Sequence, residues 1–235
     1  MGVRPPRIVA LGGGGFSDGL DPELDALGLE LTGRSRPRVC FIPTASADSE
    51  VYITRFFDAF ATRTEASWLP LFKRRDEDLR QVILGQDLVF VGGGNTANLL
   101  AIWRAHGLDV VLREAWQAGV VLAGISAGAI CWFSHGVTDS FGTGLSALDD
   151  GLGLLEGSFC PHYDGEALRR PRYRELVGAG LPGGWACDDG AALIFAGTEL
   201  REAVTARAEA AAYRLDLVGG AVEEVTLPVR RLDPA

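Results

Sequence analysis

The chain has 235 residues, of which 47% are hydrophobic and 23% are charged. These values are typical of a folded globular protein and exclude an intrinsically disordered chain. The 22 Lys and Arg residues against 31 Asp and Glu give a formal net charge of −9, which argues against nucleic acid or an anionic membrane as the main partner. Because we find neither a linker nor an internal repeat, residues 1–235 are predicted to form a single domain.

Targeting and metal-binding signals are absent from the sequence. No apolar stretch approaches the roughly 18 residues of a membrane span, and the first apolar run is too short for a signal peptide. The four cysteines contain no C-x-x-C pair, and only three histidines accompany them: Cys40, Cys131, Cys160 and Cys187, with His106, His135 and His162. We therefore expect a cytoplasmic protein with reduced thiols that needs no metal and no cofactor.

Short apolar runs alternate along the chain with segments of helical periodicity. The apolar runs predict strands that are buried on both faces, at residues 7–11, 38–42, 66–71, 87–91 and 119–124. Helices are predicted over residues 22–31, 49–62, 76–84, 96–106 and 108–118. This alternation predicts an α/β fold, namely a doubly wound, mostly parallel sheet with helices on both faces.

The last third of the chain has a different pattern. Short β-like runs follow one another with turn-length gaps, at residues 191–195, 203–206, 211–215 and 221–227. They predict antiparallel C-terminal strands at an edge of the sheet. In a sheet of this type, ligands bind beyond the carboxyl ends of the parallel strands. The residues that directly follow the strands are therefore the candidates for function.

Two glycine-rich turns follow predicted strands. Gly12–Gly15 does not fit the dinucleotide-binding pattern G-x-G-x-x-G, whereas Gly92–Ala97 fits its G-x-G-x-x-A variant. Dinucleotide binding also needs an acidic residue after the next strand. Asp109 has about the right separation, but the segment 108–118 is too short to hold both a strand and a helix. Nucleotide binding and a purely structural turn stay as alternatives to a third role, in which backbone N–H groups face an anionic oxygen.

The pentapeptide 124–128, Gly-Ile-Ser-Ala-Gly, matches the nucleophile-elbow pattern G-x-S-x-G. A buried strand precedes it and a helix is predicted over residues 127–133. A sharp turn between the two would raise the Ser126 hydroxyl above the sheet, next to the helix N-terminus. The N–H groups of Ala127 and of Gly94 could then stabilise an oxyanion. The alternative is a serine that only caps the helix.

A nucleophilic serine needs a base and a carboxylate that orients this base. His162, which lies between a proline and an Asp-Gly turn, is favoured over His135, and His106 fits a helix C-cap. Asp139 gives the chain order Ser, Asp, His and is the first candidate for the carboxylate. Glu166, Asp164 and Glu156 are the other candidates.

Five segments together resemble the peptidase E family, which includes aspartyl dipeptidases and, more remotely, cyanophycinases, and whose fold is similar to class I glutamine amidotransferases. These segments are residues 42–46, 91–96, 124–129, 161–163 and 188–192. The serine and histidine motifs, 36 residues apart, are the most specific part, and the resemblance covers most of the chain.

The resemblance implies a serine peptidase with Ser126 as nucleophile, His162 as base, Gly94 and Ala127 as oxyanion donors and Asp139 as third triad member, with Glu166 as its alternative. It further implies a short peptide substrate with a free N-terminus, such as an Asp-Xaa dipeptide. Asn95 and Arg174 are expected to bind this substrate, although the arginine-rich stretch 169–174 does not match the family pattern cleanly. Glutaminase activity is disfavoured because Ser stands where amidotransferases have Cys.

Three alternatives to an aspartyl dipeptidase stay open at this point. They are a relative with another peptide or acyl substrate, a non-catalytic amidotransferase-like binding protein, and the nucleotide-binding protein considered above. We expect neither nucleic acid nor membrane as a partner. A small hydrolase of this kind could form a homodimer.

Overall fold

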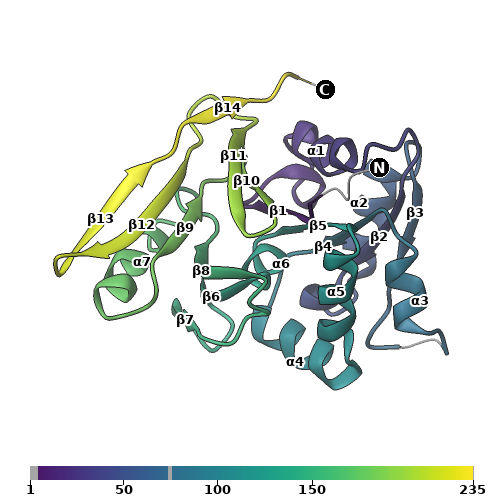
Figure 1. Ribbon diagram of the computed structural model, residues 1–235, viewed down its shortest axis with the longest axis horizontal. Coiled ribbons are helices and arrows are strands. Elements are labelled where there is room, and N and C mark those ends of the chain that lie inside the picture. The colour runs from purple at the N-terminus through teal and green to yellow at the C-terminus, as the bar shows by residue number, and fades with distance from the viewer. Residues whose placement is uncertain (1–4, 74–75, 235) are drawn as a thin grey trace.

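The computed structural model describes residues 5–73 and 76–234, and its strands form two sheets (Figure 1). The larger sheet, called sheet A here, contains β1 (Arg7–Leu11), β2 (Arg38–Ile42), β3 (Glu65–Trp68), β4 (Leu88–Val91), β5 (Val121–Ile125), β10 (Ala191–Ala196), β11 (Glu199–Thr205) and β14 (Val229–Arg231). Their order across the sheet is β14-β11-β10-β1-β5-β4-β2-β3. The five adjacent strands β1, β5, β4, β2 and β3 are parallel, and β10 joins β1 in antiparallel direction.

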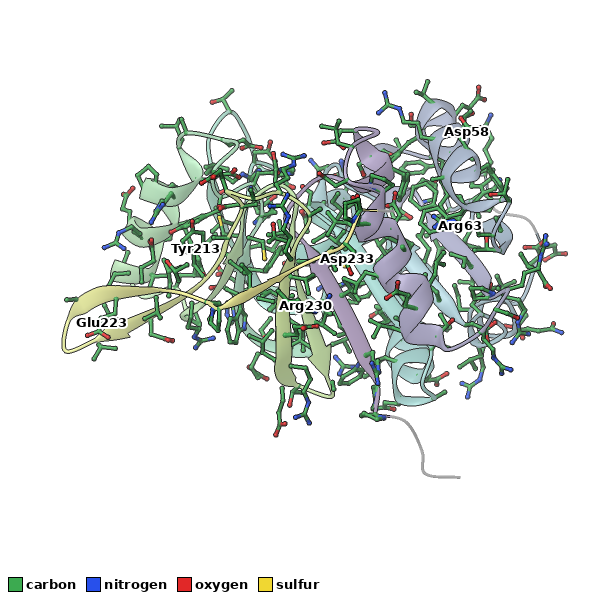
Figure 2. All side chains as sticks on the ribbon, turned by 90° about the horizontal axis from the view of Figure 1, so that it is seen from above. Asp58, Arg63, Tyr213, Glu223, Arg230 and Asp233 are labelled. Atoms are coloured by element: carbon green, nitrogen blue, oxygen red, sulfur yellow. The ribbon has the colours of Figure 1, made fainter. Side chains whose placement is uncertain are left out.

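The smaller sheet, called sheet C here, has the order β13-β12-β9-β8-β6-β7. Its strands are β6 (Phe133–Thr138), β7 (Ser146–Leu148), β8 (Leu155–Cys160), β9 (Gly184–Cys187), β12 (Ala212–Val218) and β13 (Ala221–Thr226). The hairpin of β12 and β13 lies at one end of the molecule. Figure 2 shows Glu223 toward the outer end of this hairpin and Tyr213 closer to the body of the protein.

Seven α-helices are present among the described residues, together with the short 3-10 helices η1 (Gly15–Ser17) and η2 (Thr44–Ser46). The α-helices are α1 (Pro22–Thr32), α2 (Glu50–Phe60), α3 (Leu79–Leu84), α4 (Thr96–His106), α5 (Leu108–Gln117), α6 (Ala127–Ile130) and α7 (Arg169–Gly178). None of those in the described part of the chain is long and apolar enough to cross a membrane.

Sheet A is covered on both faces because successive side chains of its strands point in opposite directions. In β1, Val9 and Leu11 pack in the core formed with α1 and α2, whereas Ile8 and Ala10 pack in the core formed with α3, α4 and α5. The α/β fold class, the parallel strands and the helices on both faces are therefore confirmed.

The four predicted C-terminal runs form antiparallel strands, but these belong to two sheets, and the last strand of the chain, β14, pairs with β11 in parallel direction. The runs near residues 191–195 and 203–206 became β10 and β11 of sheet A. The runs near 211–215 and 221–227 became the β12–β13 hairpin, which pairs with β9 in sheet C. The second sheet is not evident from the sequence, since β6 and β8 contain glycine and polar residues and lack the continuous apolar pattern of the strands in sheet A.

Candidate active site

Ser126 occupies a sharp turn between β5 and α6, as the G-x-S-x-G pattern predicts. Its backbone has φ +55° and ψ −117°, a conformation that non-glycine residues rarely adopt. A Cβ atom at position 124 would lie 2.0 Å from the carbonyl oxygen of Gly128, and one at position 128 would lie 2.3 Å from that of Val91. Only glycine fits at both positions, so the two glycines of the pattern are required by close backbone approach.

The helix that follows Ser126 is shorter than predicted. The segment 127–133 was expected to be helical, but α6 ends at Ile130 and β6 starts at Phe133. A helix of one turn carries only a small macrodipole. Stabilisation of negative charge at this turn therefore depends on individual N–H groups. Those of Ala127 and Gly94 have no hydrogen-bond acceptor within the described residues, which leaves both available to an oxyanion.

His162 follows Pro161 at the end of β8, and its backbone is also left-handed, with φ +51°. Hydrogen bonds on both sides hold this conformation. The N–H of Glu166 donates to the carbonyl of His162 at 3.2 Å, and the N–H of Tyr163 donates to the carbonyl of Cys187 at 3.0 Å. Strained backbone of this type is concentrated at functional sites. Ser126 and His162 are two of the five non-glycine residues with positive φ among those described.

The imidazole of His162 is paired with Asp189, which lies between β9 and β10. Its Nδ1 is 2.6 Å from Oδ1 of Asp189, and the two side chains are 25% and 26% exposed. The N–H of Asp189 donates to the Asp164 carboxylate at 2.8 Å. A Cβ atom at Gly13 would lie 2.0 Å from Oδ1 of Asp189, so a larger residue there would displace the carboxylate.

The pKa of Asp189 lies below its ordinary value. The hydrogen bond from His162 is the main cause, and it outweighs the opposing effect of partial burial, with further help from the charges of His162, Arg207 and Arg169. The carboxylate therefore stays ionised near neutral pH and accepts the Nδ1 proton of the ring. This fixes the tautomer in which Nε2 is free to accept a proton.

The carboxylates predicted to orient His162 are engaged elsewhere. Asp139 is exposed at the end of β6. The Glu166 carboxylate binds Arg169 at 2.8 Å. The structure thus pairs neither Asp139 nor Glu166 with the ring of His162, because Asp189 occupies the Nδ1 position.

The other candidates, His135 and Glu156, lie on strands of sheet C. His135 lies within β6, and its Nδ1 is buried without a hydrogen-bond partner among the described residues. Glu156 accepts a hydrogen bond from Ser134 at 3.3 Å.

Ser126 and His162 line the same cavity, which has a volume of about 370 Å³. The other residues that line it come from the loop after β1, from α2 and its N-cap, from the glycine turn after β4 and from the end of β5: Gly14, Ser17, Asp18, Ser49, Val51, Tyr52, Arg55, Gly93, Gly94 and Ile125. The volume lies near the lower end of the range of about 300–1,000 Å³ for small-molecule sites.

The Tyr52 hydroxyl joins two residues that line this cavity, Ser17 and Gly93. It accepts the N–H of Gly93 at 3.2 Å and is hydrogen-bonded to the Ser17 hydroxyl. Phe16, next to Ser17, is buried among aromatic rings and lies edge-on to Phe60 with ring centroids 5.5 Å apart. The loop after β1 is thereby anchored to α2 and to the glycine turn.

The two residues predicted to bind substrate have other roles. Asn95 caps α4, because its Oδ1 accepts the N–H of Asn98 at 2.8 Å and its Nδ2 donates to the carbonyl of Ser140 at 3.2 Å. Arg174 lies on α7 and donates to Glu224 at 3.0 Å. Neither side chain is among the described residues that line the cavity with Ser126.

Sequence reasoning missed Asp189, Ser17, Asp18, Tyr52 and Arg55. The segment 188–192 had been noticed for its family resemblance, but no role was given to its carboxylates. Ser17 and Asp18 follow the Gly12–Gly15 turn and carry no motif of their own. Their position next to Ser126 depends on the fold, since β1 and β5 are adjacent in sheet A.

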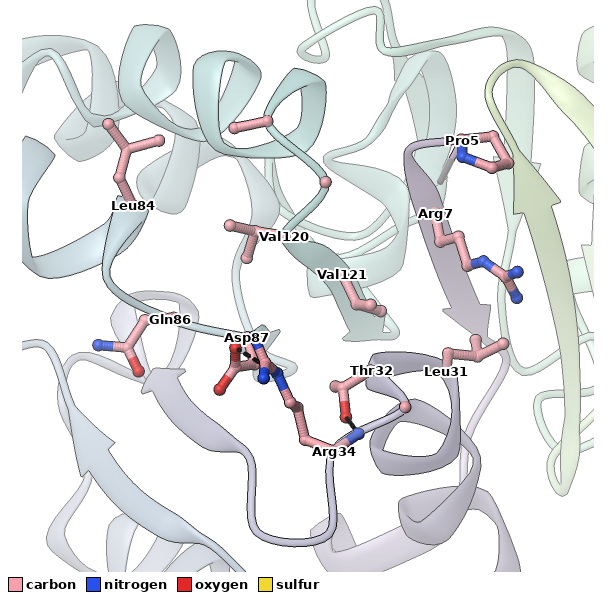
Figure 3. Close-up of a pocket in the computed structure, with 13 residues that line it drawn as sticks. Pro5, Arg7, Leu31, Thr32, Arg34, Leu84, Gln86, Asp87, Val120 and Val121 are labelled. Atoms are coloured by element: carbon pink, nitrogen blue, oxygen red, sulfur yellow. Dashed lines mark hydrogen bonds and ion pairs between the residues drawn. The ribbon is translucent and has the colours of Figure 1, made fainter. Parts of the chain in front are cut away.

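A second cavity, of about 390 Å³, lies at the opposite end of the strands (Figure 3). It is lined by residues at the beginning of β1 and β5 and just before β4, among them Arg7, Val121 and Asp87. Asp87 is neutralised by Arg38 at 3.3 Å and Arg34 at 3.7 Å. No histidine, serine or cysteine lines this cavity among the described residues. Within residues 5–73 and 76–234, no group of three or more His, Cys, Asp or Glu residues could hold a metal ion.

Comparisons with known proteins agree with this geometry. The chain is 51% identical over 231 residues to the uncharacterized peptidase YgaJ of Bacillus subtilis (strain 168), an alignment that covers 96% of this chain and 99% of the relative. It is 37% identical over 90 residues to Peptidase E of Shewanella denitrificans, covering 38% of each chain. In fold it is similar to a crystal structure of a peptidase from an acI-B1 Actinobacterium, with a TM-score of 0.68 and 20% identity over 97% of this chain and 99% of that one.

The sequence model of peptidase family S51 matches residues 8–203, the region that contains Ser126, His162 and Asp189. The chain therefore belongs to peptidase family S51 and is a serine peptidase.

Proposed function

We propose that this protein hydrolyses short peptides with a free N-terminus, such as Asp-Xaa dipeptides, through an acyl-enzyme on Ser126. The observation that carries the proposal is the arrangement around the cavity of about 370 Å³. Ser126 and His162, both on left-handed backbone, line it together, and the ring of His162 is held from behind by Asp189 at 2.6 Å.

In the first half of the reaction, Nε2 of His162 takes the proton of the Ser126 hydroxyl while the oxygen attacks the scissile carbonyl carbon. The charged imidazole is stabilised by the Asp189 carboxylate. The oxyanion of the tetrahedral intermediate accepts hydrogen bonds from the N–H groups of Ala127 and Gly94. The C–N bond then breaks, His162 gives its proton to the leaving amine, and the N-terminal part of the substrate remains as an ester on Ser126.

In the second half, His162 takes a proton from a water molecule, and the resulting hydroxide attacks the ester carbonyl. The same two N–H groups hold the second oxyanion. When the C–O bond breaks, the Ser126 oxygen recovers its proton from His162 and the carboxylate product leaves. Each residue therefore has the same role in both halves of the reaction: His162 transfers protons, and Ala127 and Gly94 bind the oxyanion.

The test is the release of free leucine from Asp-Leu by the wild-type protein and by Ser126→Ala, measured by chromatography. We expect the variant to lose about 10⁶-fold in kcat. The melting temperature should remain nearly unchanged, because the Ser126 hydroxyl has no hydrogen-bond partner among the described residues and alanine keeps the same backbone strain. Retention of most of the activity by Ser126→Ala would overturn the proposal.

A further inference from the structure

The charged side chains of the Ser126 cavity are few. Apart from His162, Arg55 is the one basic residue among the described residues that line it, and Asp18 is the one acidic residue. The remaining lining residues are glycine, serine, tyrosine and aliphatic residues. Arg55 and Asp18 are both exposed and are, besides His162, the charged groups that a substrate entering this cavity would meet.

Arg55 is held in place but its charge is not neutralised. It lies on α2, and its Nη1 donates to the carbonyl of Ser17 at 2.6 Å. No carboxylate lies within 4 Å of its guanidinium among residues 5–73 and 76–234. Arg207 on the neighbouring loop is different, since Asp21 binds both its Nε and its Nη2, at 2.9 Å and 2.7 Å. A guanidinium has five N–H donors, so most donors of Arg55 stay available for a ligand.

The hydrogen bond between Arg55 and Ser17 also fixes the orientation in which the guanidinium meets a ligand. Ser17 ends η1, whose Phe16 is buried in the aromatic cluster with Phe41 and Phe60. The contact between Arg55 and the carbonyl of Ser17 therefore ties the guanidinium to a rigid part of the site. A planar guanidinium fixed in this way is pre-organised for bidentate binding of a carboxylate.

We infer that Arg55 determines the specificity of this peptidase by binding a carboxylate of the substrate, so that its substrates are short peptides with a carboxylate near the scissile bond. The inference rests on the proposed function. The carboxylate has two sources in a dipeptide, the side chain of an N-terminal Asp and the C-terminus of the leaving residue. Asp18, of opposite charge, lines the same cavity, and its carboxylate lies 3.9 Å from Nη2 of Arg207 and accepts the N–H of Leu20 at 3.1 Å.

The experiment measures kcat/KM for four peptides with each of four proteins. The peptides are Asp-Leu, Asn-Leu, Asp-Leu-amide and Asn-Leu-amide, which remove one carboxylate, the other, or both. The proteins are the wild type, Arg55→Gln, Arg55→Lys and the control Arg36→Gln. Arg36 is exposed, does not line the cavity, and its replacement changes the net charge by the same amount.

In the wild type, removal of the carboxylate that Arg55 binds should lower kcat/KM by about 10- to 100-fold. In Arg55→Gln the same removal should have almost no effect, because the partner is already lost. Arg55→Lys should recover part of the discrimination, since it keeps the charge without the planar fork. Arg36→Gln should behave as the wild type. The carboxylate whose removal lowers kcat/KM in the wild type but not in Arg55→Gln is the one that Arg55 binds.

The inference is overturned if Arg55→Gln lowers kcat/KM equally for all four peptides or for none of them. A small uncharged fluorophosphonate, applied to the same proteins, distinguishes this failure from failure of the proposed function. Equal labelling of Ser126 in the wild type and in Arg55→Gln, without coupling to a carboxylate, refutes only the role of Arg55. Absence of labelling in the wild type refutes the proposed function itself.

Discussion

The two sheets supply different parts of the candidate active site. Sheet A carries Ser126 on the turn after β5, whereas sheet C carries His162 after β8. Asp189 lies in the connection from β9 to β10, where the chain passes from sheet C back to sheet A, and it forms a β-bridge with Gly13 of the loop after β1. The proposed nucleophile and base are therefore brought together only when both sheets are in place.

The pKa values of buried carboxylates also differ between the part of the molecule built on sheet A and the part built on sheet C. Asp25, on α1 behind sheet A, is buried, and desolvation raises its pKa to about 7. Glu224, on β13 of sheet C, has a lowered pKa. Burial opposes this shift, but hydrogen bonds from Tyr163, Arg174 and Arg170 outweigh it. The charged form is thus unfavourable at Asp25 and favourable at Glu224, so a change of pH affects the two halves in opposite directions.

The largest effect is expected at the junction between the sheets. Asp189→Asn should lower kcat by about 10⁴-fold, because the amide no longer stabilises the imidazolium and favours the wrong tautomer of His162. The matched controls are Asp139→Asn and Glu166→Gln, whose carboxylates do not pair with the ring, and these should stay within a few-fold of the wild type. A large loss in either control together with an active Asp189→Asn would assign the orienting role to another carboxylate.

The next effect concerns stability on the side of sheet A. Asp25→Asn removes a charge whose burial is costly, while its Oδ1 can still accept the N–H of Phe16, which Asp25 accepts at 3.1 Å. In the wild type, the raised pKa lowers the free energy of unfolding as pH rises from about 4 to about 7, and this cost persists above pH 7. The variant should therefore be more stable at pH 8, by up to about 4 kcal/mol, and nearly equal to the wild type at pH 4.

Urea unfolding of Asp25→Asn at the two pH values checks this expectation. Asp58→Asn, which changes an exposed acid on α2, is the control and should leave the free energy of unfolding within about 0.5 kcal/mol. A gain that is the same at pH 4 and pH 8 would show that desolvation of Asp25 is not its cause.

A smaller effect of opposite sign is expected in sheet C. Glu224 accepts hydrogen bonds from the Tyr163 hydroxyl at 2.7 Å and from Arg174 at 3.0 Å, and it is paired with Arg170. Glu224→Gln should destabilise the protein by about 1–3 kcal/mol at pH 7. Since the pKa of Glu224 is lowered in the folded state, its contribution is present above pH 4–5 and is lost as pH falls below its ordinary pKa.

The matched control for Glu224→Gln is Glu223→Gln, the exposed neighbour on the same strand (Figure 2). Equal unfolding free energies for the two variants at pH 7 would mean that the network around Glu224 adds no stability. Because Tyr163 follows His162 directly, a loss of kcat in Glu224→Gln without a change in KM would further link this network to the position of the base.

The two halves also differ in how much of them the sequence could predict. In sheet A, the runs at 7–11 and 38–42 and the helix at 96–106 coincide with β1, β2 and α4, because continuous apolar runs and glycine caps act locally. In sheet C, β8 contains Glu156, Gly157 and Ser158, and this composition gives no local signal of a buried strand. The second sheet is stabilised by packing against the first, which no short window of sequence records.

The site follows the same division. Ser126 and its turn could be predicted because the glycines on either side of it are a local requirement of the backbone. The partner of His162 could not, since Asp189 is 27 residues away and reaches the ring only through the pairing of Gly13 with the β9–β10 connection. Asp139 is a candidate because of its place in the chain order, and Glu166 because it is close to His162 in sequence. Neither criterion determines which carboxylate lies next to the ring in the folded protein. Arg55 was missed for the same reason.

The most direct test of the account is the location of the covalent adduct formed by a fluorophosphonate probe, determined by mass spectrometry of peptides from the treated protein. We predict a single adduct on Ser126 that is absent from Ser126→Ala and forms much more slowly in Asp189→Asn. An adduct on a different residue, or peptide cleavage that continues at full rate in a protein without any adduct, would contradict the account.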